Sequence, residues 1–381
     1  MKHEFTITLT PDEERNEAVL AARIAEGLAK AGAEPAPGAA ARTPSLIKRS
    51  IDARHGRVLV HLRYGIPAGA SEDAEAAGRT GRARRAADPA KRVVIVGSGP
   101  AGLFAALRLL EAGVTPIVVE RGRETDARKR DIALISREGR VDPDSNYCFG
   151  EGGAGTFSDG KLYTKSKKRG DEARVRAIFR EHGADEAVLT DAHPHIGTDR
   201  LPGIVNAMRA EIERHGGSVF FETRCADVLT EKDPSGGIAA RGIRAVSADG
   251  GERDIPADAV ILATGHSARD AHEILARLET LTGIPALEAK TFAMGVRVEH
   301  PRETIDRIQY HGRAADPSLG AATYKLSSQE NGRGVYSFCM CPGGLVVPSA
   351  SEDDAIVVNG MSPSSRATKW SNAAIVVEIR P

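Results

Sequence analysis

The chain has 381 residues, more than a single hydrophobic core usually supports, so we expect two or three domains. Its 41% hydrophobic and 27% charged residues are typical of an ordinary globular protein, and Lys+Arg and Asp+Glu both total 52, so no net charge draws the chain to nucleic acid or an anionic membrane. No apolar stretch reaches the roughly 20 residues of a membrane span and no secretory signal opens the chain, so we expect a cytoplasmic protein.

Residues 1–70 have the pattern of a small α/β domain. Residues 3–9 and 56–66 alternate as strands do, and 14–31 carry apolar residues at helical spacing. Residues 71–90 show no apolar period, which is typical of a charged, solvated linker; a basic handle for RNA or an acidic protein is the alternative. The arginines of this segment are Arg79, Arg82, Arg84 and Arg85.

A nucleotide-binding α/β pattern begins at residue 91. The apolar run 92–97 predicts a buried parallel strand, 100–113 a helix, and 116–120 a second strand. Residues 123–170 are polar and rich in glycine, so no regular element is expected there. Further along, the pattern predicts helices at 172–182, 202–215 and 270–282, strands at 218–229 and 258–265, a hairpin over 238–256, and a strand-rich segment over 291–360.

The first of two G-x-G-x-x-G stretches lies between the first predicted strand and its helix. Gly97, Gly99 and Gly102 would form the turn that brings backbone N–H groups to a nucleotide pyrophosphate. Glu120 ends the second strand near the spacing of about 20 residues at which a carboxylate takes the ribose hydroxyls, which favours FAD or NAD over NADP. The predicted contacts here are Gly97, Gly99, Pro100, Ala101, Gly102, Glu120 and Arg121.

The second glycine stretch, "FGEGGAGTFSDGK" at 149–161, has the same spacing without the same context. No apolar strand precedes it and no helical pattern follows it, so it does not predict a second dinucleotide turn or a separate NAD(P)H domain. A loop that a flat ligand approaches closely is one interpretation, and a flexible surface loop is the other. The candidate ligand contacts are Gly152, Gly153, Ser158 and Lys161.

Several stretches, taken in order, resemble the uncharacterised FAD-dependent dehydrogenases of the glutathione-reductase-like class. They are "VGSGPAGLFAAL", "FGEGGAGTFSDGKL", "PHIGTDRL", "TGHSARD", "FAMGVRVEHP", "SFCMCPGGLVV" and "NGMSPSSR". The resemblance implies an α/β fold with a Rossmann-like FAD-binding domain, a β-meander and a strand-rich second domain. It also implies that Ala263, Thr264 and Gly265 approach the cofactor, and that Cys225 and Ala226 lie near its adenine.

The function implied by the resemblance is an FAD-dependent oxidoreductase with hydride transfer through the flavin N5, an unknown small-molecule substrate and NAD(P)H as a possible transient donor. Proteins of this class return late in the chain to the nucleotide domain, and no such segment is present here, so the chain is expected to lack that part and to bind FAD weakly. The expected domains are 1–70 (N-terminal α/β), 71–90 (linker), 91–285 (FAD-binding), 286–360 (strand-rich, on the substrate side) and 361–381 (start of the return).

The remaining candidates concern chemistry beside the flavin. His266 could move a proton and Arg269 could hold an anionic group. The alternative is that this segment is only a helix start, with Ser267 as its N-cap. Cys339 and Cys341 could pass electrons as a thiol pair, or could simply pack. No metal site is predicted, because His193 and His195 have no set of ligands around them. An RNA-binding flavoprotein and a non-catalytic relative remain the alternative functions, and nucleic acid is not the expected partner.

Overall fold

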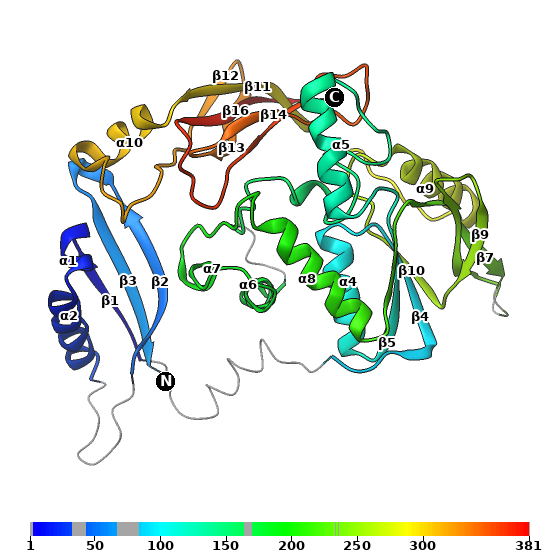
Figure 1. The fold of residues 1–381 in the computed structure, drawn as a ribbon, viewed down its shortest axis with the longest axis horizontal. Helices are drawn as coiled ribbons and strands as arrows, with labels where there is room; N and C mark the ends of the chain where they lie inside the picture. Colours follow the sequence, from blue (N-terminus) through cyan, green and yellow to red (C-terminus); the bar gives the residue numbers. More distant parts are fainter. Residues whose placement is uncertain are drawn as a thin grey trace, which may run out of the picture.

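Figure 1 shows the fold as a computed structural model, which describes residues 3–32, 43–66, 84–163, 170–232, 234 and 236–380. Most of the predicted linker, including Arg79 and Arg82, lies outside these residues, and so does the basic run 165–169 on which an RNA-binding function would depend. Arg84 is described and pairs with Glu181 and Glu211 at 3.0 and 2.9 Å. The end of the predicted linker therefore belongs to the domain that follows it.

The N-terminal domain is a three-stranded antiparallel sheet in the order β1-β3-β2, with two helices packed against it. Leu9 and Val60 form its core together with Ile24 of the second helix. The strand β2 was missed because a bulge between Leu46 and Lys48 interrupts its alternation. The elements are β1 (His3–Leu9), α1 (Pro11–Arg15), α2 (Glu17–Lys30), β2 (Ser45–Asp52) and β3 (Leu59–Ile66).

A four-stranded parallel sheet in the order β10-β4-β5-β6 forms the centre of the next domain. Along β4 the side chains alternate: Ile95 packs against α4 and α8, whereas Val94 and Val96 pack against the β7-β8-β9 meander and α9. Helices thus cover one face and the meander covers the other. The strands are β4 (Asp88–Val96), β5 (Val114–Val119), β6 (Ser218–Phe220), β7 (Thr223–Lys232), β8 (Ile238–Ser247), β9 (Glu252–Pro256) and β10 (Ala259–Leu262).

Two expectations for this domain were wrong. The single strand predicted over 218–229 is two strands in different sheets, and Glu222 breaks it with a φ of +50°. The stretch 123–170, where no regular element was expected, contains α5, whose buried positions include Arg128 and Asp131 and so conceal the apolar period. The helices are α4 (Pro100–Glu111), α5 (Thr125–Glu138), α6 (Glu172–Glu181), α7 (Ala187–Thr190), α8 (Leu201–Arg214) and α9 (Arg269–Thr282).

The strand-rich domain contains a four-stranded antiparallel sheet in the order β11-β16-β13-β12 and a β14-β15 ribbon. β16 pairs with β11 from Phe292–Ile379 to Pro301–Trp370, and with β13 on its other side. Residues 370–379 therefore complete this sheet, whereas the sequence had suggested that 361–381 begin a return to the nucleotide domain. The elements are β11 (Phe292–Pro301), α10 (Arg302–Tyr310), β12 (Ser327–Glu330), β13 (Arg333–Cys341), β14 (Leu345–Pro348), β15 (Val358–Met361) and β16 (Trp370–Ile379).

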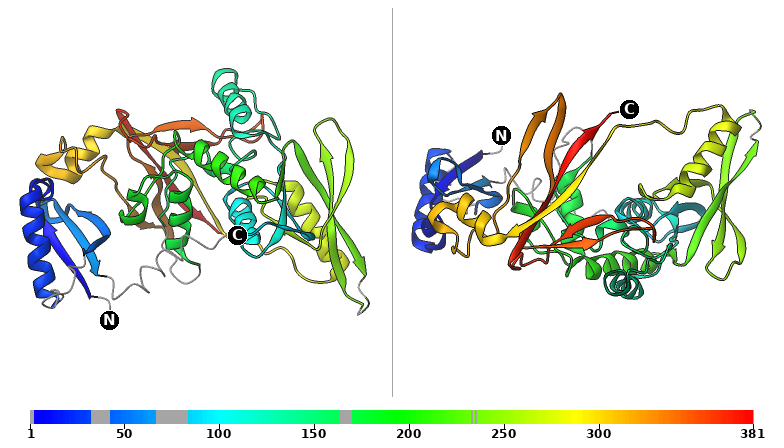
Figure 2. Two further views of the ribbon diagram at one scale, coloured as in Figure 1. Left: turned by 60° about the horizontal axis from the view of Figure 1, so that its bottom comes forward. Right: turned by 90° about the horizontal axis from the view of Figure 1, so that it is seen from above.

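The strand-rich domain lies between the other two units in Figure 1, and both views in Figure 2 place the meander at the end of the molecule opposite the N-terminal domain. Contacts join the N-terminal domain to both of its neighbours: the side chain of Arg49 donates a hydrogen bond of 2.9 Å to the carbonyl of Ser318, and the carbonyl of Arg49 accepts one of 2.9 Å from Ala192 N. Within the part of the chain that the structure describes, no helix is both long and apolar enough to cross a membrane.

Candidate functional site

A cavity of about 560 Å³ lies at the carboxyl ends of β4, β5 and β10. Ligands of open α/β sheets bind at this edge, outside the carboxyl ends of the strands. The predicted residues that line it are Gly97, Gly99, Pro100, Ala101, Glu120, Arg121, Gly153, Cys225, Ala263, Thr264, Gly265 and His266. The predicted residues outside its lining are Gly102, Gly152, Ser158, Lys161, Ala226, Arg269, Cys339 and Cys341.

The three glycines of the first turn have different reasons to be glycine. Gly97 has a φ of +105°, and a Cβ there would overlap the carbonyl oxygen of Ala263. A Cβ at Gly102 would overlap the carbonyl of Gly97, so the fold itself requires both residues. A Cβ at Gly99 would meet only Gly153 Cα at 3.7 Å, an ordinary contact. Gly99 therefore keeps space open beside the start of α4, where no side chain caps the helix.

Glu120 is buried at the end of β5, where its carboxylate accepts hydrogen bonds from two loops. Ser98 donates to one oxygen from its N–H and from its hydroxyl, both at 2.9 Å. Gly122 N and Gly150 N donate to the other oxygen at 3.0 and 2.9 Å. These four donors match the roughly four acceptor positions of a carboxylate. Glu120 thus ties the first glycine turn to the second glycine stretch, a role the sequence did not indicate, while its contact with ribose stays a prediction.

The second glycine stretch is packed directly against the first. Gly152 N donates to the carbonyl of Ser98 at 3.0 Å, and a Cβ at Gly153 would lie 2.9 Å from Gly99 Cα, too close to fit. Gly153, Ala154 and Gly155 form a short 3-10 turn that lines the cavity. The second stretch follows no strand and leads into no α-helix. It therefore differs from the first turn, although the spacing of its glycines is the same.

Arg128 of α5 hydrogen-bonds to the backbone at the start of the second glycine stretch. Its fully buried guanidinium donates hydrogen bonds to the carbonyls of Asn146, Tyr147, Gly150 and Glu151 over 2.6–3.2 Å. Burial lowers the pKa of Arg128 to about 10, which leaves it charged at neutral pH. Sequence reasoning missed this residue, since a charged side chain in a polar helix gives no sign that it is buried.

Glu151 holds the same stretch to two helices. Its buried carboxylate accepts hydrogen bonds from Thr125 N and Thr125 Oγ1 at 2.8 and 2.6 Å, and from Arg209 Nε at 2.7 Å. Thr125 begins α5, and Arg209 comes from α8. A carboxylate at a helix start is also favoured by the helix dipole. The loop that borders the cavity is therefore fixed by charged groups on both sides.

The structure places the side chains of His266 and Arg269 in different surroundings. His266 lines the cavity, whereas the exposed side chain of Arg269 pairs with Glu352 at 3.0 Å. The capping alternative was also wrong, because α9 has Ala268 at its N-cap and no side chain hydrogen-bonds there. His266 remains the candidate for proton movement in this segment.

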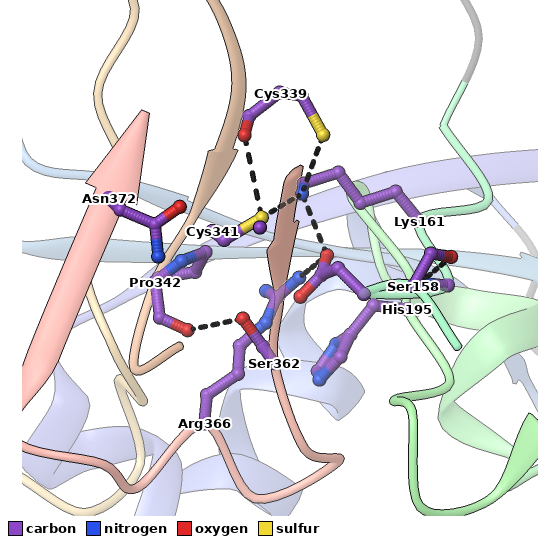
Figure 3. A network of polar contacts seen from close by, with 12 residues as sticks. Ser158, Lys161, His195, Cys339, Cys341, Pro342, Ser362, Arg366 and Asn372 are labelled. Atoms are coloured by element: carbon purple, nitrogen blue, oxygen red, sulfur yellow. Dashed lines mark hydrogen bonds and ion pairs between the residues drawn. The ribbon is translucent and has the colours of Figure 1, made fainter. Parts of the chain in front are cut away.

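Ser158 and Lys161 lie in a second polar cluster, shown in Figure 3. Ser158 Oγ donates to the carbonyl of Gly155 at 2.7 Å. Lys161 Nζ lies 2.9 Å from Asp159 Oδ2, 3.5 Å from Cys341 Sγ and 3.9 Å from Cys339 Sγ. The structure therefore brings the predicted thiol pair together with a predicted cofactor contact, although these residues are far apart in the chain.

A polar cavity of about 470 Å³ opens where the three domains meet. Arg49, His193, His195, Tyr310 and Arg366 are among its lining residues. Burial lowers the pKa of both histidines, and Arg366 adds to the effect. Across the described residues, no group of three or more His, Cys, Asp or Glu side chains is arranged to hold a metal ion.

The nucleotide domain identifies the family. Residues 91–289, just over half of the chain, match the family described as pyridine nucleotide-disulphide oxidoreductase. The chain belongs to this family. Residues 291–381 match the FAD-dependent protein, C-terminal domain-like family, and residues 1–66 match a domain of unknown function.

The chain is also similar to individual proteins. It is 42% identical over 292 residues to an uncharacterized protein of Clostridium beijerinckii, covering 76% of this chain and 52% of that protein. The chain thus spans about half the length of this curated relative. A flavoprotein/dehydrogenase from Cytophaga hutchinsonii is 12% identical, with 76% of this chain and 56% of that chain covered and a TM-score of 0.33. CtdE in complex with FAD is 14% identical, with 75% and 58% covered and a TM-score of 0.28.

FAD is the cofactor of this family, and the residues around the main cavity fit it. The start of α4 offers backbone N–H groups with no capping side chain, as a pyrophosphate requires. Gly99 and Gly265 leave the space beside it open, since a Cβ at Gly265 would meet no other atom within 4 Å. The cavity continues to Cys225 at the start of the meander, where the adenine is expected.

Proposed function

We propose that the protein is an FAD-dependent oxidoreductase that acts on a small molecule and receives electrons from transiently bound NAD(P)H. The observation that supports this most directly is the glycine-lined cavity of about 560 Å³ at the start of α4, in a chain of an FAD-dependent family. FAD, when bound, supplies hydride and electron transfer, so the protein supplies position, polarity and access. The four cysteines are free, which suits work in the reducing cytoplasm.

The residues of the chain divide this work. The N-terminus of α4 would hold the pyrophosphate through its N–H groups and the positive end of its dipole, and Gly99 lets the phosphates approach. Glu120 fixes the positions of Ser98 and Gly150, and so keeps the two walls of the cavity in register. His266 on the lining is the side chain placed to exchange a proton with substrate or solvent.

Gly99→Ala tests the cofactor site without disturbing the fold. The added methyl would meet its nearest neighbour at 3.7 Å, so the protein should fold normally, but the methyl would occupy space next to the pyrophosphate. We expect FAD affinity to fall at least about 10-fold, equivalent to about 1.4 kcal/mol. Flavin absorbance per protein after incubation with FAD, together with a titration of intrinsic fluorescence, measures this.

Gly203→Ala is the matched control. Gly203 lies in α8, away from the cavity, and its added Cβ would meet no atom within 4 Å, so this variant should bind FAD like the unchanged protein. Equal FAD affinity in all three proteins would reject the proposed phosphate position. A wild-type protein that takes up no FAD would reject the proposed function itself.

A further inference from the structure

Cys339 and Cys341 are brought together by a bulge in β13. A regular strand separates Cα atoms two residues apart by roughly 6.6 Å, near the upper limit for a disulfide. Here the pairing with β16 shifts between Phe338 and Cys341. Cys339 has a φ of +47°, a backbone conformation that residues other than glycine rarely adopt. The kinked strand keeps both residues in one cluster: Cys341 Sγ donates a hydrogen bond to the carbonyl of Cys339 at 3.4 Å, and Lys161 Nζ lies within 4 Å of both sulfurs. Backbone strain of this kind concentrates at functional positions.

Positive groups surround the two sulfurs. Lys161 Nζ lies 3.9 Å from Cys339 Sγ and 3.5 Å from Cys341 Sγ (Figure 3). Arg297 Nη1 donates to the carbonyl of Cys339 at 3.2 Å and lies 4.0 Å from Cys341 Sγ. Asp159, the nearby carboxylate, is neutralised by Lys161 at 2.9 Å and Arg366 at 2.8 Å. With both thiols protonated, the cluster has three positive groups and one carboxylate, and this excess of two positive charges favours a thiolate.

The two thiols differ in ionisation and access. The neighbouring Cys341 thiol, then the charges of Lys161 and Arg297, lower the pKa of Cys339. The neighbouring Cys339, together with burial, raises the pKa of Cys341. Cys339 is partly exposed, whereas Cys341 is fully buried. One sulfur is thus placed to attack a reagent from solvent, and the other to react only with its neighbour.

We propose that Cys339 and Cys341 form a hydroperoxide-reactive pair, in which Cys339 is the nucleophile and Cys341 is the resolving thiol. The Cys339 thiolate attacks a peroxide oxygen, the O–O bond breaks, and the departing alkoxide or hydroxide takes a proton from Lys161. Cys339 becomes a sulfenic acid. The Cys341 sulfur then attacks the Cys339 sulfur, the S–O bond breaks, and the hydroxide leaves as water with the Cys341 proton. Lys161 regains its proton from solvent, and two thiols have been oxidised to a disulfide by one peroxide.

The other two cysteines provide an internal comparison. Burial, followed by the charge of Asp227, raises the pKa of Cys225 to about 11, so its thiol should react slowly. Cys148 is partly buried on the lining of the main cavity, outside the Lys161 cluster. Hydroperoxide should therefore oxidise the pair before either of these residues.

The test treats the purified protein with stoichiometric hydrogen peroxide at pH 7 and maps thiols by differential alkylation and peptide mass spectrometry. We expect a Cys339–Cys341 disulfide, with Cys148 and Cys225 still reduced. In Cys341→Ser the sulfenic acid should persist on Cys339 and react with dimedone. Oxidation of Cys148 or Cys225 first, or absence of the disulfide, would overturn the proposal. Flavin content has no part in this readout, so its result is independent of the proposed function.

Lys161→Met tests the source of reactivity. We expect the Cys339 oxidation rate at pH 7 to fall at least about 10-fold, because an ordinary thiol is ionised there to only a few per cent. In the unchanged protein the rate should rise with pH around an apparent pKa below that of an ordinary thiol, and in Lys161→Met around a higher value. Lys161→Arg keeps the charge and should recover most of the rate. Lys129→Met, at an exposed position of α5, is the control for folding. Unchanged rates in Lys161→Met would overturn the assignment.

Discussion

The two glycine stretches have the same spacing but are shaped by different forces. Gly97 to Gly102 are shaped locally, by a strand that ends, a tight turn and a helix that starts. Gly150 to Gly155 are held by charged side chains. Arg128 of α5 and Glu120, which follows β5, hold the stretch from outside, and Glu151 within it binds to Thr125. The first therefore works as a nucleotide turn by its own geometry. The second works as a cavity wall only because other elements hold it.

This difference predicts that charge removal should damage the second stretch far more than the first. The first turn has backbone hydrogen bonds such as Gly97 N to Val119 O at 2.8 Å, which side-chain substitutions leave in place. The second depends on side chains that are buried and charged. Removing one partner from such a network leaves the others buried without hydrogen bonds, and this is costly.

The largest effect is expected for Arg128→Met. The carbonyls of Asn146 and Tyr147 would lose their donor, whereas those of Gly150 and Glu151 keep hydrogen bonds from Gly153 N and Thr156 Oγ1. Each buried acceptor without a donor costs about 1–3 kcal/mol, so we expect a loss of about 2–6 kcal/mol of unfolding free energy. The stretch 146–151 should also become sensitive to protease. Urea unfolding followed by circular dichroism and limited proteolysis measure both effects.

The neighbouring Arg130→Met is the control for that experiment. Arg130 lies on the exposed face of the same helix, so its loss should change stability by no more than about 0.5 kcal/mol. Similar stabilities for Arg128→Met and Arg130→Met would show that the second stretch does not depend on the buried guanidinium.

Glu120→Gln should have the next largest effect. The change replaces one acceptor oxygen by an NH2 group, which then faces donors from Ser98 or from Gly122 and Gly150. We expect a loss of about 2 kcal/mol, because at least one buried donor is left without an acceptor. Glu138→Gln, at an exposed site, serves as the reference in the same urea unfolding series. A difference below about 0.5 kcal/mol between the two variants would contradict the bridging role of Glu120.

The sequence was sufficient for features that depend on local patterns. The α/β class, the strand–turn–helix at Gly97 to Gly102 and the hairpin over 238–256 follow from periodicity and turn chemistry, and the structure contains them. The family followed from the resemblance of several motifs taken in order, and residues 91–289 match it. The Cys339/Cys341 pair was also noticed from its spacing, although nothing in the letters around it indicated that Lys161 would lie 3.5 Å from Cys341.

The sequence was not sufficient where distant segments meet. α5 was missed because it buries Arg128 and Asp131 rather than an apolar stripe, and the place of β16 was wrong because strand partners cannot be read from one strand's own residues. Arg269 lies outside the cavity lining for the same reason: Glu352, the residue with which it pairs, is remote in the chain. Long-range electrostatic pairing leaves no period in a single sequence.

Ser98→Ala should have the smallest effect and sharpens the comparison most. The substitution removes the hydroxyl donor to Glu120 but leaves the backbone N–H of residue 98 on the same oxygen, so the carboxylate keeps three of its four partners. We expect a loss of about 1 kcal/mol, the usual net contribution of one hydrogen bond. The double variant with Glu120→Gln should lose less than the sum of the single losses, since both changes act on one network. Strict additivity in urea unfolding would mean that the two walls of the cavity are stabilised separately and that Glu120 does not couple them.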